Sequence, residues 1–249
     1  MCSGCYSIAH RNQALHNLRA QYQGMTKAAA VSKTKKTTGT ASGRRKLVDI
    51  RKDNSEQILR VAEQVFSERG FKGTTISAIA DAAELPKANI LYYFKSKEGL
   101  YKAVLVDLLQ GWMHHMDDMT ADQHPREALR NYIVSKIRQS KEHPNASRIF
   151  AAEVLHGAPF LREQLEGPLK EQFERTCGVI RSWVAKRWMD PVSPEHLMFM
   201  LWSSTQSYAD FEVQSSILLS RDALEEADYN EGVELITRVV LKGCGVSLV

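Results

Sequence analysis

Polar residues that suit contact with a nucleic-acid duplex gather between positions 74 and 97 of this sequence. A lysine neutralises a phosphate, a tyrosine hydroxyl donates to a phosphate oxygen, and an asparagine amide both donates to and accepts from adenine in the major groove. An ordinary αα-hairpin with a solvated basic face is the alternative interpretation. The candidate DNA contacts are Thr74, Thr75, Lys87, Ala88, Asn89, Tyr92, Tyr93 and Lys97.

Two short helices must position these side chains. Thr74 and Thr75 are residue types that cap a helix N-terminus, and apolar residues recur at helical spacing after them, so a helix is predicted over residues 75–83. Pro86 cannot continue that helix but suits the first turn of a new one, which is predicted to run to residue 94. The residues of this second helix that are predicted to face inward are Ile90, Leu91 and Phe94.

Residues 70–100 resemble the DNA-binding motif of the TetR-type transcriptional repressors, in which a glycine, paired threonines, Ile-Ala, a turn, an aromatic cluster and Phe-x-x-Lys-Glu-x-Leu follow one another. Two positions depart from that pattern, because Glu84 stands where the turn usually carries a glycine and Pro86 stands where a serine is usual. A non-glycine residue at positive φ is uncommon, so the turn is the least typical part of the motif. The matching residues are Gly70, Thr74, Thr75, Ile79, Ala80, Ala83, Lys87, Tyr92, Tyr93, Phe94, Lys97, Glu98 and Leu100.

Composition excludes several other classes of protein. The chain has 249 residues, of which 43% are hydrophobic, and it carries a net charge of +4. No apolar run approaches the roughly 18 to 20 residues that span a bilayer, and the four cysteines are scattered, so we expect no membrane partner and a cytoplasmic location. Neither the Cys2–Cys5 pair nor the Glu153-x-x-His156 pair has the further ligands that a zinc or di-iron site needs. We therefore expect no metal, no cofactor and no catalytic residues.

The first 50 residues are predicted to be a disordered basic arm, because they lack helical or strand periodicity and are rich in small and basic residues. Met25 is a candidate translation start, which would leave residues 1–24 untranslated. The basic stretch after it is either a solvated tail or an arm that lies near the minor groove, and both interpretations stay open.

Helical periodicity dominates the rest of the chain, and no segment alternates as a strand does. A first helix is predicted from about Ser55 to Gly70, with Asp53 and Glu56 as a capping pair, and a linking helix begins at Lys97. The fold class is therefore all-α, with a helix-turn-helix domain over residues 51–98 and a larger helical domain over residues 99–249. The further predicted helices cover residues 126–140, 147–156, 168–189, 194–219 and 230–242.

One polar strip on the helix after Pro194 is a candidate binding surface. Trp202, Gln206 and Asp210 are four residues apart, so an indole, an amide and a carboxylate lie along one helix face and could meet a flat polar heterocycle. The alternative is that this strip packs against a second subunit.

The form of the second short helix, together with residues 147–161 and 199–214, is similar to the Rut-type branch of the TetR-type repressors, which senses free pyrimidines such as uracil and thymine. The resemblance implies a homodimer that pairs through residues 194–219 and 230–242, binds a palindromic operator and is released by a small effector. An activator with the same DNA contacts, and an all-helical enzyme or metalloprotein, are the alternatives. The residues that the resemblance assigns to the effector are Phe150, Glu153, Trp202, Gln206, Asp210 and Phe211.

Overall fold

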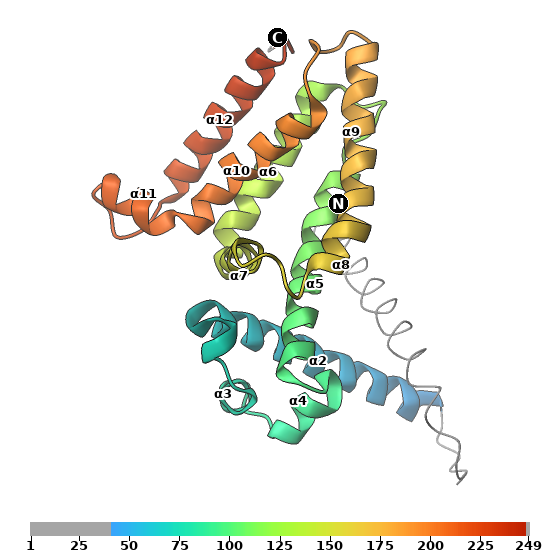
Figure 1. The fold of residues 1–249 in the computed structure, drawn as a ribbon, viewed down its shortest axis with the longest axis vertical. Helices are drawn as coiled ribbons and strands as arrows, with labels where there is room; N and C mark the ends of the chain where they lie inside the picture. The colour runs from blue at the N-terminus through green and yellow to red at the C-terminus, as the bar shows by residue number, and fades with distance from the viewer. Residues whose placement is uncertain (1–40, 248–249) are drawn as a thin grey trace. The chain divides into compact units, whose positions relative to one another are not determined.

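The computed structural model describes residues 41–247, with side chains from residue 54 onward. These residues form helices and connecting turns and contain no strand, so the predicted all-α fold class is confirmed. The helices are α2 (Ala41–Gly73), α3 (Ile76–Ala82), α4 (Lys87–Phe94), α5 (Lys97–Asp117), α6 (Pro125–Glu142), α7 (Pro144–Leu155), α8 (Arg162–Gln164), the π-helical turn η1 (Leu165–Leu169), α9 (Lys170–Ala185), α10 (Pro194–Asp210), α11 (Glu212–Leu218) and α12 (Glu226–Gly243) (Figure 1).

Helix α2 begins earlier than the sequence predicted. It starts at Ala41 and runs through Asp53 and Glu56, so the disorder predicted for residues 41–50 is wrong and the predicted capping pair lies inside a continuous helix. Arginine, lysine and leucine in this stretch are good helix formers, which explains the extension. The rest of the predicted arm, with Met25 and the Cys2–Cys5 pair, lies outside the described residues.

The chain divides into two compact units, and the smaller one contains α3 and α4. Within the described residues it takes in residues 41–62 and 75–103. Ile58, Ile79, Ile90 and Leu100 are fully buried at its core. The Gln57 Nε2 atom donates to the carbonyl oxygen of Ala83 at 3.0 Å and so ties α2 to the end of α3. This packing fixes the orientation of the two short helices relative to the first one.

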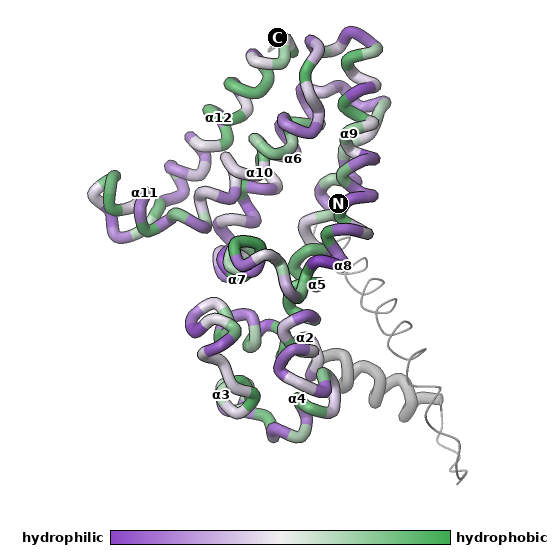
Figure 2. Tube along the Cα trace, in the orientation of Figure 1, coloured by the Kyte–Doolittle hydropathy of each residue, from purple (hydrophilic) through white to green (hydrophobic). Residues whose placement is uncertain are grey.

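The larger unit takes in residues 63–74 and 104–247. Its core lies where α10 packs on α6, α7 and α9, and where α12 packs on α6. Trp183, Ile133, Ile180 and Met198 are fully buried there. Hydrophilic and hydrophobic residues alternate along these helices (Figure 2), as expected of amphipathic helices that share one core.

Two parts of the larger unit differ from the prediction. The helix predicted over residues 194–219 is two helices. Phe211 has φ −118° and ψ 24°, which interrupts the helical geometry between α10 and α11. The segment 162–167 was not predicted to be helical, yet it forms α8 and the start of a π-helical turn that contains Pro168, the first residue of the next predicted helix. No helix of the described residues is long and apolar enough to cross a membrane.

Candidate DNA-binding surface and effector site

Helices α3 and α4 are joined by a tight turn whose geometry follows from three residues. The Thr75 Oγ1 atom accepts from the backbone N–H of Ala78 at 3.1 Å and caps α3, as predicted. Glu84 has φ 53°, so this non-glycine residue takes the left-handed conformation that the family pattern assigns to glycine. Pro86 precedes α4 in an extended conformation.

The outward face of α4 carries the side chains that the sequence proposed for DNA. Lys87 and Ala88 are exposed, and Tyr92 has 57% of its surface exposed. Asn89, Tyr93 and Lys97 are half-buried, so part of each remains accessible. This arrangement suits insertion of α4 into a major groove, with flanking residues on phosphates.

Two predictions for this region are wrong. Leu91 was predicted to face inward, yet 37% of its surface is exposed, because Ile90 alone fills the centre of the α4 contact. Thr74 was predicted to cap α3 and contact DNA, yet it is only 1% exposed. Its hydroxyl donates to the carbonyl oxygen of Gly70 at 2.8 Å, so it stabilises the end of α2 and cannot reach a phosphate.

In the larger unit, one face of α6 meets α10 through polar side chains. The Trp202 Nε1 atom donates to the hydroxyl of Tyr132 at 2.7 Å, and the Ser140 hydroxyl donates to the carbonyl oxygen of Thr205 at 2.9 Å. Lys136 lies between Tyr132 and Ser140 on this face, one helical turn from each. We call these α6 residues and the facing strip 202–210 of α10 the polar seam.

Lys136 is the buried charge of the polar seam. It is 4% exposed, and its Nζ atom lies 4.7 Å from the centroid of the Trp112 ring, whose face attracts a cation. Burial lowers the pKa of Lys136 to about 8, and the nearby Asp210 carboxylate opposes that shift. Among the described residues no carboxylate lies within ion-pair distance of its ammonium group, so the charge is only partly compensated.

Helix α7 contributes two side chains that contact residues in and beside the polar seam. The Phe150 ring stands edge-on to Trp112, with centroids 4.7 Å apart. The Ser147 hydroxyl donates to Asp210 Oδ1 at 2.5 Å, which orients that carboxylate. Lys136 is buried, whereas Trp112, Phe150, Gln206 and Asp210 are half-buried. These residues supply two aromatic rings, an ammonium donor, an amide and a carboxylate, which are groups that can contact a flat polar molecule.

Three of the predicted effector residues, Trp202, Gln206 and Asp210, belong to the α10 strip of the polar seam, and Phe150 lies on α7 against Trp112. Their role stays a prediction. Phe211 is not there, because α10 ends at residue 210 and 60% of the Phe211 surface faces solvent. Glu153 is also engaged elsewhere: its Oε1 atom accepts from the backbone N–H groups of Phe160 and Leu161.

Sequence reasoning missed Trp112, Tyr132, Lys136 and Ser147. A signal for two of them existed, because Tyr132 and Lys136 recur with Ser140 every four residues beside apolar Ile133 and Ile137. Such a polar row on an apolar helix face indicates a buried polar contact. Residues 41–247 contain no group of three or more His, Cys, Asp or Glu side chains that could hold a metal ion.

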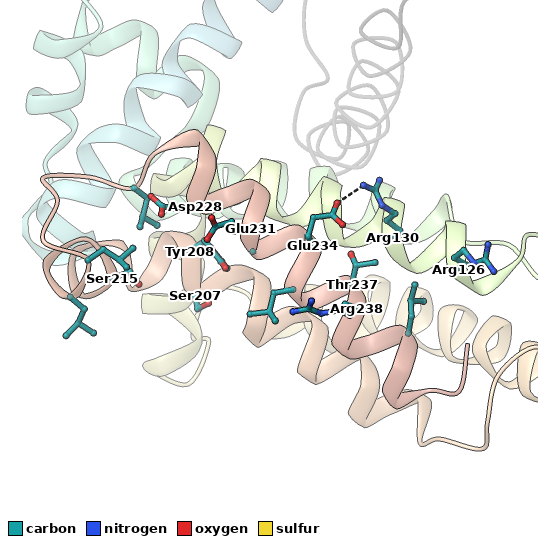
Figure 3. Close-up of a pocket in the computed structure, with 16 residues that line it drawn as sticks. Arg126, Arg130, Ser207, Tyr208, Ser215, Asp228, Glu231, Glu234, Thr237 and Arg238 are labelled. Carbon is teal, nitrogen blue, oxygen red and sulfur yellow. Dashed lines mark hydrogen bonds and ion pairs between the residues drawn. The ribbon is translucent and has the colours of Figure 1, made fainter. Parts of the chain in front are cut away.

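A separate open groove of about 1030 Å³ lies between α6, α10, α11 and α12. Figure 3 shows its polar side chains, including the ion pair in which Arg130 donates to Glu234 at 2.8 Å. A Cβ atom on Gly232 would lie 2.1 Å from the Tyr208 hydroxyl, so any other residue at this position would require the Tyr208 ring to move. None of the predicted effector residues lines this groove.

Exposed apolar side chains line part of the groove. Leu218 and Leu235 line it with 75% and 51% of their surfaces exposed. An apolar surface of this extent marks a contact with another protein chain. The exposed apolar residues of α10, α11 and α12 are Phe199, Met200, Val213, Ile217, Leu218, Leu235 and Val239, and Leu219 follows α11.

A capped helix, a tight turn and a second helix with basic and aromatic residues on its outer face define a helix-turn-helix DNA-binding regulator. Residues 58–104 match the family of bacterial regulatory proteins described as tetR, and residues 105–247 match the C-terminal region of YcdC-like proteins. The chain belongs to the TetR family of transcriptional regulators. Regulators of this family bind DNA and a small-molecule effector and act as dimers.

Relatives and solved structures agree with this assignment. The chain is 39% identical over 208 residues to the HTH-type transcriptional regulator RutR of Escherichia coli K12, which covers 84% of this chain and 95% of that one. It is 27% identical over 194 residues to the HTH-type transcriptional repressor NicS of Pseudomonas putida, and the match covers 76% of this chain and 91% of NicS. These relatives are regulators, so the prediction that the chain is not an enzyme is confirmed.

The fold is shared with the ketosteroid transcriptional regulator KstR2 of Mycobacterium tuberculosis. That structure superposes with a TM-score of 0.61 at 20% identity and covers 76% of this chain and 94% of its own. A TetR-family regulator from Marinobacter aquaeolei gives a TM-score of 0.61 at 18% identity, and the match covers 79% of this chain and 98% of that regulator. The predicted arrangement of a helix-turn-helix followed by a larger helical region is therefore confirmed as the fold.

Replacing Lys87 by alanine is expected to weaken operator binding about 3- to 10-fold at moderate salt. Removing one phosphate contact should also reduce the slope of log affinity against log salt concentration by about 1, equally for specific and unrelated DNA. Titration of labelled operator at several salt concentrations measures both. Lys170→Ala removes an exposed lysine from α9 and should change neither value; equal slopes for the two variants would exclude Lys87 from the interface.

Proposed function

We propose that the protein is a homodimeric cytoplasmic repressor that holds a palindromic operator and is released by a pyrimidine such as uracil or thymine. Each subunit inserts α4 into a major groove, and the half-sites lie about 34 to 36 Å apart or a multiple of that distance. The proposal rests chiefly on the buried Lys136 ammonium beside the Trp112 ring in the polar seam. The resemblance to RutR along most of both chains supports it.

The polar seam offers groups that complement a pyrimidine ring. Uracil has two carbonyl oxygens that accept hydrogen bonds and ring N–H groups that donate them. Lys136 can donate to a carbonyl oxygen, the Gln206 amide can donate and accept at once, and Asp210 can accept from a ring N–H. Trp112 and Phe150 supply apolar faces against which a flat ring can pack.

The proposed dimer uses the face around the groove of α10, α11 and α12. Its exposed leucines, isoleucine and valines would be buried by a second copy, which a two-fold axis brings against the same surface.

The proposal is tested by titrating the purified protein onto the intergenic DNA upstream of its own gene, with and without uracil and thymine, at one fixed salt concentration. Tight binding that a pyrimidine releases is the expected result. An effector releases DNA only if it binds the released state more tightly than the DNA-bound state. Tight binding that neither pyrimidine changes would discard the effector, and absence of binding would discard this operator.

Replacing Gln206 by alanine is expected to weaken uracil binding about 5- to 30-fold and to leave operator binding unchanged. The loss follows from one or two missing hydrogen bonds in a buried site, each worth about 1 kcal/mol. Isothermal titration with uracil, in the absence of DNA, measures the effect. Ser203→Ala on the same helix removes an exposed hydroxyl that bonds only its own helix at 3.1 Å and should behave as wild type. If Gln206→Ala binds uracil normally, the polar seam is not the effector site.

A further inference from the structure

The buried carboxylate of Glu153 makes hydrogen bonds that effector binding does not explain. Glu153 lies on α7 and is 4% exposed. Its Oε1 atom accepts from the backbone N–H of Phe160 at 2.6 Å and from that of Leu161 at 3.2 Å. A single carboxylate oxygen therefore holds two consecutive residues of the segment that follows α7.

The segment held by Glu153 has an unusual backbone. Gly157 has φ 85° and Ala158 has φ 54°, so two successive residues lie in the left-handed region. The left-handed conformation is unfavourable for alanine, so the surrounding contacts must offset its cost. The Ala158 N–H donates to the carbonyl oxygen of Glu153 at 2.9 Å, and Leu161 is fully buried. Residues 157–161 are thus fixed at both ends, and Glu153 provides the hydrogen bonds at the far end.

Phe160 carries the position of this segment to the end of α2. Its ring packs on Phe71, with centroids 4.7 Å apart and an angle of 50° between the planes. Both residues belong to the larger unit. Phe71 follows Gly70, where α2 leaves helical geometry with φ 64° and ψ 172°. Because glycine accepts a wide range of backbone angles, Gly70 can accommodate a shift of Phe71.

The chain connects Phe71 directly to the DNA-reading helices. Thr75, the cap of α3, is only four residues after Phe71. Between them, Thr74 donates to the carbonyl oxygen of Gly70 and so links the bend of α2 to the start of α3. A displacement of Phe71 is transmitted through these few covalently connected residues.

Helix α7 connects the other end to the polar seam. Ser147 and Phe150, which contact Asp210 and Trp112, lie on the same helix as Glu153. Glu153 is six positions after Ser147 on α7, which is a rise of about 9 Å along the helix axis. A small rotation or translation of α7 on ligand binding would move the Glu153 carboxylate and the segment that it holds.

We propose that Glu153 is a positioning residue that couples the polar seam to α3 through the 157–161 segment, Phe160 and Phe71. The proposal rests on the proposed function for its effector, and it assigns to Glu153 the transmission of binding rather than contact with the ligand. Its hydrogen-bond acceptor, and not its negative charge, is the property that matters. A glutamine at this position keeps an acceptor oxygen and retains the coupling.

The test compares the wild type with Glu153→Gln, Glu153→Ala and Phe160→Ala. Three quantities are measured for each: the operator Kd without uracil, the operator Kd with saturating uracil, and the uracil Kd without DNA. The ratio of the two operator constants is the coupling between the sites. In Glu153→Ala and Phe160→Ala this ratio should fall at least tenfold, while the uracil Kd changes less than threefold. Glu153→Gln should keep the wild-type ratio, and so should Leu155→Ala, which truncates an exposed neighbour.

Wild-type coupling in both alanine variants would overturn the proposal. So would a loss in Glu153→Gln as large as that in Glu153→Ala, because the charge would then be the essential property. A double variant should lose no more coupling than either single alanine variant, since both act on one connection. Phe160→Ala removes only a ring and leaves the Glu153 hydrogen bonds, so it remains informative if Glu153→Ala fails to fold.

Hydrogen exchange separates this proposal from the identity of the effector. If uracil does not release the wild-type protein, the proposed effector is wrong, but the connection can still be measured without any ligand. Glu153→Ala should then speed amide exchange at Phe160 and Leu161 and also at residues 71–75, whereas Glu153→Gln should not. Faster exchange confined to residues 157–161 would show that the contact with Phe71 transmits nothing.

Discussion

Replacing Lys136 by methionine is expected to abolish release of the operator by uracil and to raise the free energy of unfolding at pH 7 by up to about 3 kcal/mol. The gain in stability follows from the lowered pKa of about 8, compared with an ordinary value of 10.5, because the folded state pays for holding a buried charge. Methionine is also unbranched and fills a similar volume. The loss of release follows from removal of the proposed donor to the ligand carbonyl.

The pH dependence gives the sign of this effect independently. Between pH 8 and about 10.5 the unfolded chain keeps the Lys136 proton while the folded chain releases it, so the contribution of Lys136 to unfolding free energy rises with pH. The stability advantage of Lys136→Met should accordingly be full at pH 7 and shrink as the pH rises towards 10. Denaturant unfolding at several pH values measures the difference between variant and wild type.

Lys141→Met is the matched control for Lys136→Met. Lys141 lies on the same helix, but it is exposed and pairs with Glu226, itself exposed. Exposed ion pairs contribute little to stability, so the control should stay within about 0.5 kcal/mol of wild type at every pH. If Lys136→Met is destabilised at pH 7, or if its difference from wild type does not vary with pH, Lys136 is better compensated than the structure indicates.

Replacing Leu235 by glutamate is expected to convert the protein to a monomer and to weaken binding to a full palindromic operator at least 100-fold. Leu235 lines the groove of the proposed interface, and a two-fold axis would bring two such carboxylates into one apolar contact. Loss of the second binding unit removes the advantage of simultaneous binding to two half-sites. Sedimentation and titration with the full operator and a single half-site measure these effects.

Leu155→Glu is the control for Leu235→Glu, since it makes the same substitution at a leucine that is 84% exposed on α7, away from the groove. It should remain a dimer. Half-site affinity should be equal for the wild type and Leu235→Glu, because α4 is untouched. A dimeric Leu235→Glu protein with normal operator affinity would exclude the face around the groove as the interface.

The helix-turn-helix could be predicted from sequence because its determinants are local. Thr75 caps α3 with its own hydroxyl, and Pro86 cannot belong to the preceding helix, so both boundaries are encoded by residues at the boundary. The geometry of the turn was less predictable, because Glu84 takes a positive φ that is uncommon for a residue other than glycine. Thr74 was misassigned because its burial depends on how the end of α2 folds back, which neighbouring residues do not reveal.

The candidate effector site could be predicted only in part, because its remaining residues come together by tertiary packing. Four-residue spacing identified Trp202, Gln206 and Asp210, but the opposing lysine lies on a helix some 70 positions earlier in the chain. The break at Phe211 carries no glycine or proline, and its neighbours Ala209 and Glu212 are instead held by Arg148. Long-range contacts of this kind are invisible to periodicity.

The close approach of α10 and α12 has a consequence for the symmetry of the proposed dimer. The Tyr208 hydroxyl occupies the space that a side chain at position 232 would need. A methyl group there would displace the Tyr208 ring in one subunit. In a two-fold symmetric dimer both subunits carry the same change, so a Tyr208 ring would be displaced on each side of the axis. One added carbon atom in the sequence would therefore change the proposed dimer at two places.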